Sequence, residues 1–408
     1  MKKTIFFICI LCFLLLYSDI ATLIGFGNMK LTISVVPLTA FLLYEALNNK
    51  IIFSYRVVPE ICLIVMGVII IIVEYLIGQN FVRRILLFLF LPYVLSIYLF
   101  PSRRKYQKPL RYAIYVVLLI QIAVIIYERL MNSVLLSSEE QYYIYNMYGD
   151  AWSFKACGIY GHPLTGAMIL SVTNIFVLVS NLKIRVKLLI FISIMVGLLC
   201  LNERGNIVIT SLSSIPFVYR YLSKQEISKR ILMSFFVILL FFFIFQGLSD
   251  SSFGGRLFHH KEGFQDVSSA ARLEAYSAFD YLNKNILLWG FGDEKITLIN
   301  LTYAENGYIT ILLIYGVVLG APLLLFLLYY IYKRLYIYRW QDALLIAFVF
   351  GGIGLTNPQL ANPLQWFYFI INLYAFGPIK GNSKIYIGSR FSSYLTDRNV
   401  KKRLFVHK

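Results

Sequence analysis

The stretch that decides the fold is ICLIVMGVIIIIVEYLI, residues 61–77, in which Glu74 is the one charged side chain. A transmembrane helix needs about 20 mostly apolar residues, and about 17 is the lower limit. Water is absent from the bilayer core, so the backbone amides of such a run must bond to one another, which a helix achieves. Residues 61–77 are therefore predicted to span a membrane.

Apolar runs of this kind recur along the chain. We expect helices near Ile5–Tyr17, Leu31–Leu47, Ile61–Ile77, Ile85–Phe100, Tyr112–Tyr127, Pro163–Ser180, Leu188–Leu201, Ile207–Tyr219, Ile231–Phe245, Asn306–Tyr332, Ala343–Leu355 and Leu364–Phe376. The sequence thus predicts an all-α polytopic membrane protein of about twelve transmembrane helices, with residues 1–408 forming a single membrane domain. The first run follows Lys2 and Lys3 and also fits a cleaved signal peptide, but no small-residue cleavage site follows cleanly, so a retained helix is favoured.

Composition and charge agree with a membrane protein. Hydrophobic residues make up 59% of the chain and charged residues 14%, against about 25% charged in soluble proteins. The net charge of +18 comes from basic residues between apolar runs rather than on one soluble face, so nucleic acid is not an expected partner. Cys157 is the one cysteine in a predicted exterior loop, so we expect neither a disulfide framework nor a metal site.

The distribution of Lys and Arg sets the orientation. With both termini inside, most of the 38 basic residues fall on inner connections and ends, although Arg83 and Arg84 fall outside. Two long loops then lie outside, at residues 128–162 and 246–305. A connection of about 60 residues far exceeds the usual length between packed helices, and long loops often carry function. Within the longer loop, residues 268–284 have the spacing of a short amphipathic helix, which puts Arg272 and Tyr276 on nearly one face.

Four short motifs lie at the predicted outer surface. They are GIYGHP at residues 158–163, NERG at 202–205, Arg272 ahead of WGFG at 289–292, and ENGY at 305–308. In this order and spacing the set resembles the O-antigen polymerase and ligase superfamily over about residues 158–320. Ligases of that family tend to have a histidine where this chain has Glu305, so the resemblance favours a polymerase.

The resemblance implies an activity and its partners. The enzyme would extend undecaprenyl-diphosphate-linked oligosaccharide into O-antigen, capsular or exopolysaccharide at the outer face of a bacterial cytoplasmic (inner) membrane, without a metal or nucleotide cofactor. Expected partners are the lipid-linked oligosaccharide, membrane lipid, a flippase and a chain-length regulator protein.

Three residues are the candidate catalytic groups. Arg204 and Arg272 would bind the diphosphate, because a guanidinium group donates paired hydrogen bonds and stays charged. Glu305 would orient or deprotonate the acceptor hydroxyl. Structural roles are the alternative: Arg204 pairing with Glu203 or reaching the interface, and Glu305 stabilising a helix N-terminus.

Further candidates would bind substrate. His162 either joins the site or only starts a helix, and Asn306 belongs to the ENGY motif. Tyr276, Trp289 and Tyr308 offer rings on which a sugar can stack. Arg256, near His259 and His260, would contact phosphate or glycan, with a solvated basic loop as the alternative.

Other functions remain open on sequence alone. A transporter, such as a flippase for the same lipid-linked sugar, shares the helix number, and ligase-type transfer shares the motifs. A non-catalytic scaffold would need neither arginine. We see no repeat relating the two halves, and charge gathers at outer helix ends, which favours an enzyme over a transporter.

Overall fold

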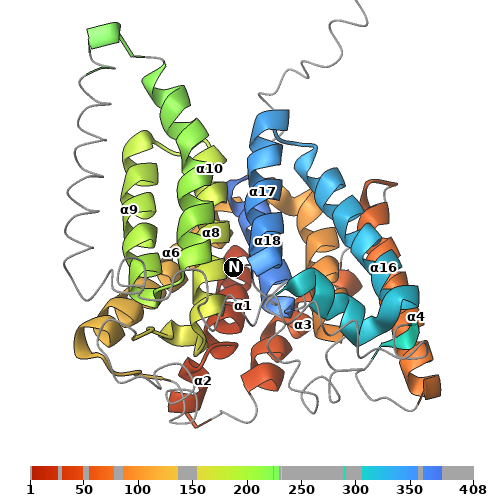
Figure 1. Ribbon diagram of the computed structural model, residues 1–408. Helices are drawn as coiled ribbons and strands as arrows, with labels where there is room; N and C mark the ends of the chain where they lie inside the picture. The colour runs from red at the N-terminus through yellow and green to blue at the C-terminus, as the bar shows by residue number, and fades with distance from the viewer. Residues whose placement is uncertain are drawn as a thin grey trace, which may run out of the picture. The chain divides into compact units, whose positions relative to one another are not determined.

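The computed structural model describes residues 2–25, 30–48, 55–77, 86–136, 154–223, 225–228, 231, 288–290, 306–356 and 362–378. Their regular elements are all helical (Figure 1). The α-helices are α1 (Lys2–Leu16), α2 (Ile20–Leu23), α3 (Lys30–Asn48), α4 (Val58–Ile77), α6 (Leu91–Met131), α8 (Pro163–Val179), α9 (Ile184–Leu201), α10 (Arg204–Leu222), α16 (Gly307–Leu335), α17 (Trp340–Thr356) and α18 (Pro363–Phe376), with single turns η2 (Tyr55–Val57), η3 (Leu86–Phe90) and η4 (Gly158–Tyr160). The chain divides into two compact units, Met1–Gly377 and Pro378–Lys408, and all of these helices belong to the first.

Among the described residues, four stretches are long and apolar enough to cross a membrane: Val58–Leu76, Phe88–Met131, Ile184–Leu201 and Gly307–Leu335. Three shorter apolar helices accompany them, at Ile33–Asn48, Pro163–Val179 and Trp340–Leu355. The expected class, a helical membrane protein, is confirmed at this level, and the number of about twelve spans stays a prediction. Residues 232–287, with the predicted helices near 231–245 and 268–284, lie outside the described residues.

Helix α6 is one hydrogen-bonded element where the sequence predicted two. The predicted helix ends at Phe100 and Tyr112 are wrong, because the helix continues through the basic residues between them. Pro101 and Pro109 lie inside it, and each proline removes a backbone hydrogen bond and bends its helix. The expected inner loop is therefore a bend within a helix.

Contacts around this bend show that it is sharp. A straight helix would hold Tyr98 and Tyr106 about 12 Å apart along its axis, yet their ring centroids are 5.5 Å apart. The ring centroid of Phe88, just before α6, lies 6.4 Å from that of Trp366 in the first turn of α18. Gln107, further along α6, donates a hydrogen bond to the backbone carbonyl just past the end of α18. The first arm of α6 thus runs along α18 before the chain turns.

Neighbouring helices pair at their ends as the predicted alternation of direction requires. Lys2 at the start of α1 forms a 3.0 Å ion pair with Glu45 near the end of α3. Arg220, near the end of α10, forms an ion pair with Asp342 near the start of α17. Helix α1 packs against α3 and α6 through its buried face.

Side chains of α6 cap the end of α18. The carbonyls of Leu373 and Ala375 near its end, and of Gly377 just past it, accept hydrogen bonds from Arg103, Arg111 and Gln107 respectively. Residues four apart share one face of a helix, so these three donors of α6 point the same way. The last carbonyls of a helix lack partners within it, and cations there also oppose its negative dipole end. The basic cluster therefore has a structural task that the charge pattern alone did not reveal.

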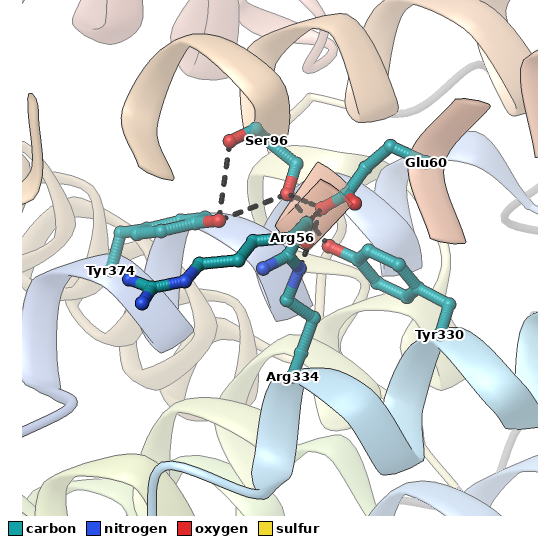
Figure 2. A network of polar contacts seen from close by, with 6 residues as sticks. All are labelled: Arg56, Glu60, Ser96, Tyr330, Arg334 and Tyr374. Carbon is teal, nitrogen blue, oxygen red and sulfur yellow. Dashed lines mark hydrogen bonds and ion pairs between the residues drawn. The ribbon is translucent and has the colours of Figure 1, made fainter. Parts of the chain in front are cut away.

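A buried polar network joins α4, α6, α16 and α18 (Figure 2). Its members are the side chains of Glu60, Ser96, Tyr330, Arg334 and Tyr374 and the backbone carbonyl of Arg56. Glu60 Oε1 accepts hydrogen bonds from Arg334 Nε at 2.6 Å and from Ser96 Oγ at 2.7 Å. Glu60 is 0% and Arg334 5% exposed, so each is the main compensation for the other's buried charge. We call this group the Glu60 network.

Candidate functional site

The end of the predicted loop 128–162 is a tightly held segment, residues 154–162, which we call the outer segment after the side on which the sequence predicts it. The Glu128 carboxylate, on α6, accepts hydrogen bonds from the backbone amides of Cys157 at 2.8 Å and Gly158 at 2.7 Å. Gln121, two turns earlier, accepts one from the amide of Ile159 at 2.8 Å. Gly158 has a positive φ of 65°, and a Cβ there would lie 2.6 Å from the Gln121 side chain, so glycine is required. Buried side chains of α6 therefore fix the backbone of the outer segment.

The start of the outer segment is tied to the turn between α9 and α10. The carbonyl of Phe154 accepts hydrogen bonds from Arg129 at 2.6 Å and from Asn202 at 3.4 Å. Asn202 ends α9 in the left-handed conformation, φ 56°, which asparagine tolerates better than most residues. The GIYGHP and NERG motifs, about 40 residues apart in sequence, are thereby brought together.

A charged cluster lies where these two motifs meet. Lys155 Nζ and Glu203 Oε1 form an ion pair at 3.0 Å, with side chains 17% and 6% exposed. Glu203 occupies the N-cap position of α10, and Arg204 is the first residue of that helix. Sequence reasoning considered Glu203 only as a partner for Arg204 and missed Lys155, a single lysine ahead of the GIYGHP motif.

His162 belongs to this cluster and also starts a helix. Its Nδ1 accepts a 3.1 Å hydrogen bond from the amide of Leu164, which makes it the N-cap of α8. Burial lowers the pKa of His162 to about 4, Lys155 acts in the same direction, and Glu203 opposes them. The imidazole is therefore neutral at neutral pH, with its proton on Nε2. The two readings of His162, helix start and site member, are thus compatible.

Helix α16 is broken near its start, where the sequence predicted a continuous helix from Asn306 to Tyr332. Gly316 has φ 69° and ψ 177°, so the segment Gly307–Tyr315 forms a separate half-helix, and Figure 1 shows the turn. A Cβ on Gly320 would lie 3.1 Å from the Ile311 carbonyl, which shows that the half-helix folds back. The Asn306 side chain caps it by accepting hydrogen bonds from the amides of Tyr308, at 3.0 Å, and Ile309, at 3.2 Å.

The WGFG motif meets α16 at this break. Gly290 has a positive φ of 83°, and a Cβ built on it would lie 2.5 Å from the amide nitrogen of Gly316. A Cβ on Gly316 would in turn lie 2.5 Å from the amide nitrogen of Gly290. The two backbones touch, so any side chain at either position would separate them. Trp289, a predicted stacking residue, is 44% exposed beside this contact.

The half-helix and α10 meet the same part of α17. Tyr308 donates a 3.3 Å hydrogen bond to the carbonyl of Gly351, and a Cβ on Gly354 would lie 3.0 Å from its ring. From α10, the Ile209 side chain packs against Gly352: a Cβ built on Gly352 would lie 3.3 Å from the Ile209 side chain. The ENGY motif and the start of α10 therefore flank one glycine-rich stretch of α17, although the described contacts of the Tyr308 ring are structural.

Several helices begin at this end of the described bundle, which we call the site end. They are α8, α10, α18 and the half-helix of α16. A helix N-terminus carries a partial positive charge, and here Arg204 and Lys155 add full charges. The site end is thus suited to an anion such as a diphosphate. Among the described residues no group of His, Cys, Asp and Glu is placed to hold a metal ion.

The structure brings some predicted site residues together and leaves others outside its description. His162 and Arg204 stand at the starts of α8 and α10, near the Lys155–Glu203 pair. Trp289 is next to the contact between Gly290 and Gly316, and Asn306 and Tyr308 stand at the start of the half-helix. Arg256, Arg272, Tyr276 and Glu305 lie outside the described residues. No protein-family model and no curated protein matches this sequence.

Proposed function

We propose that this chain polymerises undecaprenyl-diphosphate-linked oligosaccharide repeat units into O-antigen, capsular or exopolysaccharide at the outer face of the bacterial cytoplasmic membrane. The observation that carries the proposal is a shared packing surface: Ile209 of α10, the helix that Arg204 begins, and Tyr308 of the ENGY motif pack on adjacent glycines of α17. A cation for the donor and a carboxylate for the acceptor are needed side by side in such a transfer.

The proposed reaction joins two carrier-linked glycans. An acceptor hydroxyl oxygen bonds to the anomeric carbon of the donor, the bond from that carbon to the diphosphate breaks, and the carrier leaves as a diphosphate. Arg204 and Arg272 stabilise the charge that develops on the leaving diphosphate, because their planar forks match its oxygens. Glu305 orients the acceptor hydroxyl, and a carboxylate takes its proton. A flippase would supply the repeat units, and a chain-length regulator would act on the growing polymer.

Export of the same lipid-linked repeat unit is the second candidate. The observation in its favour is the break of α16 at Gly316, since interrupted helices often form the substrate sites of transporters. The half-helix begins at the site end with its Asn306 cap, and its described contacts include α17, the WGFG motif and the rest of α16. In an enzyme the same break has another explanation: the half-helix would hold the ENGY motif in a fixed position.

Polymerisation by the purified protein tests the proposal. Liposomes containing the protein and synthetic undecaprenyl-diphosphate-linked repeat units should yield a ladder of longer glycans on a gel, with free carrier diphosphate released. Arg272→Ala should give no ladder, whereas Arg220→Ala, a change on the far end of α10, should give the wild-type ladder. A wild-type protein that moves the substrate across the bilayer without lengthening it would contradict the proposal.

A further inference from the structure

Resting on the proposed function, we infer that the Lys155–Glu203 ion pair is exchanged when the donor binds. Lys155 leaves Glu203 for the donor diphosphate, and the released Glu203 carboxylate accepts the proton of the acceptor hydroxyl. The pair thus serves as a latch that exposes the base only when a donor is present. We call it the latch pair.

The location of the latch pair fits this exchange. It lies at the start of α10, directly beside Arg204, where the diphosphate is proposed to bind. The pair is neither deeply buried nor freely exposed, with Lys155 at 17% and Glu203 at 6% side-chain exposure. A lysine with partial access to solvent can turn toward an incoming anion, while the glutamate it leaves stays inside the site.

The backbone around the latch pair is fixed, so exchange needs only a side-chain rotation. The carbonyl of Phe154, the residue before Lys155, is held by Arg129, and the amide of Ala156 lies 3.4 Å from the carbonyl of Cys200. Lysine ends in a compact ammonium group on a flexible stem, and its three donors are not tied to one geometry. A latch of this kind suits lysine, whereas bidentate diphosphate recognition suits Arg204.

Charge decides the direction of the exchange. A diphosphate diester carries two negative charges, whereas Glu203 offers one, so the cation gains more attraction by turning to the diphosphate. Glu203 then has no lysine holding its oxygens and can accept a proton. In the transfer step the acceptor oxygen bonds to the anomeric carbon, its proton goes to Glu203, and the carrier diphosphate leaves with the electron pair of the broken bond. Glu305 orients the acceptor, and Glu203 takes the proton.

Equilibrium binding to a polyprenyl diphosphate tests the latch directly. With geranylgeranyl diphosphate and protein purified in detergent, Lys155→Gln should bind about ten-fold more weakly, the size of one charge-assisted hydrogen bond. Glu203→Gln should bind several-fold more tightly than the wild type, because Lys155 is no longer attracted to the negative charge of Glu203, and yet should make no polymer. The double variant should bind as weakly as Lys155→Gln. A pair that is only structural would weaken binding in both single variants.

Controls separate the possible failures. The ion pair Arg220–Asp342 joins α10 to α17 away from the site end, so Arg220→Gln and Asp342→Asn should leave diphosphate affinity unchanged. The Glu203 side chain makes no capping hydrogen bond, so its replacement by glutamine keeps the helix start intact. Weaker binding by Glu203→Gln, or near-normal polymer from it, would overturn the latch while leaving the proposed function in place. A wild-type protein that binds no diphosphate would overturn the proposed function itself.

Discussion

Substitution of Arg204 by alanine should abolish polymer while leaving the protein folded and in the membrane. Arg204 is the first residue of α10, beside the latch pair and at the positive end of the helix dipole. Loss of its guanidinium removes two directed hydrogen bonds to the leaving diphosphate, and the loss of one such donor typically lowers the rate about 100- to 1000-fold. The measurement is the glycan ladder made by cells carrying the variant, with protein level followed by immunoblot.

The lysine variant makes this prediction specific. Arg204→Lys keeps the charge but replaces a planar fork by a point charge, so it should restore little polymer. Near-normal polymer in Arg204→Lys would mean that the residue supplies only charge. Arg220→Lys, on the same helix but paired with Asp342, is the matched control and should behave as the wild type.

Breaking the Glu60 network from one side should destabilise the protein by about 3–5 kcal/mol, because it leaves a buried charge without its partner. Arg334→Met strands the Glu60 carboxylate, which is fully buried between α4, α6 and α16. Glu60→Met strands the guanidinium of Arg334 in the same way. The measurement is reversible unfolding in mixed detergent micelles with increasing fractions of denaturing detergent.

The double variant distinguishes pairing from packing. Glu60→Met with Arg334→Met removes both charges, and two apolar side chains of similar size should recover most of the lost stability. Ser96 keeps hydrogen bonds to Tyr330 and Tyr374 in that variant, so it is not stranded. Single variants that lose less than about 1 kcal/mol would show that the pair is not the main compensation for its own burial.

The described helices could largely be predicted from the sequence, because apolar length and basic flanks are local signals. The bend in α6 could be predicted only in part, from Pro101 and Pro109. That the helix continues through the basic residues depends on α18, because Arg103 and Arg111 donate hydrogen bonds to its carbonyls. Neither the prolines nor the charge pattern indicates that this segment pairs with α18, which follows more than 250 residues later in the sequence.

The break of α16 was not predictable for a related reason. Gly316 stands in an ordinary apolar run, and glycine is common in membrane helices. Its left-handed conformation is set by Gly290, which comes from another segment and touches its backbone. Of the proposed site, the motifs indicated candidate residues, whereas the Lys155–Glu203 pair joins positions 48 residues apart and needed the structure.

Location of the lipid-linked repeat units in a Glu305→Gln strain tests the central claim most directly. Glutamine keeps the shape of the side chain and removes its charge, so a carboxylate that orients the acceptor would be lost without disturbing export. Isolated cells would be probed with a membrane-impermeant enzyme that cleaves the repeat-unit glycan. The account predicts single, unpolymerised repeat units on the outer leaflet, open to the enzyme. Repeat units trapped on the cytoplasmic leaflet and protected until the cells are lysed would contradict it and identify the chain as the transporter.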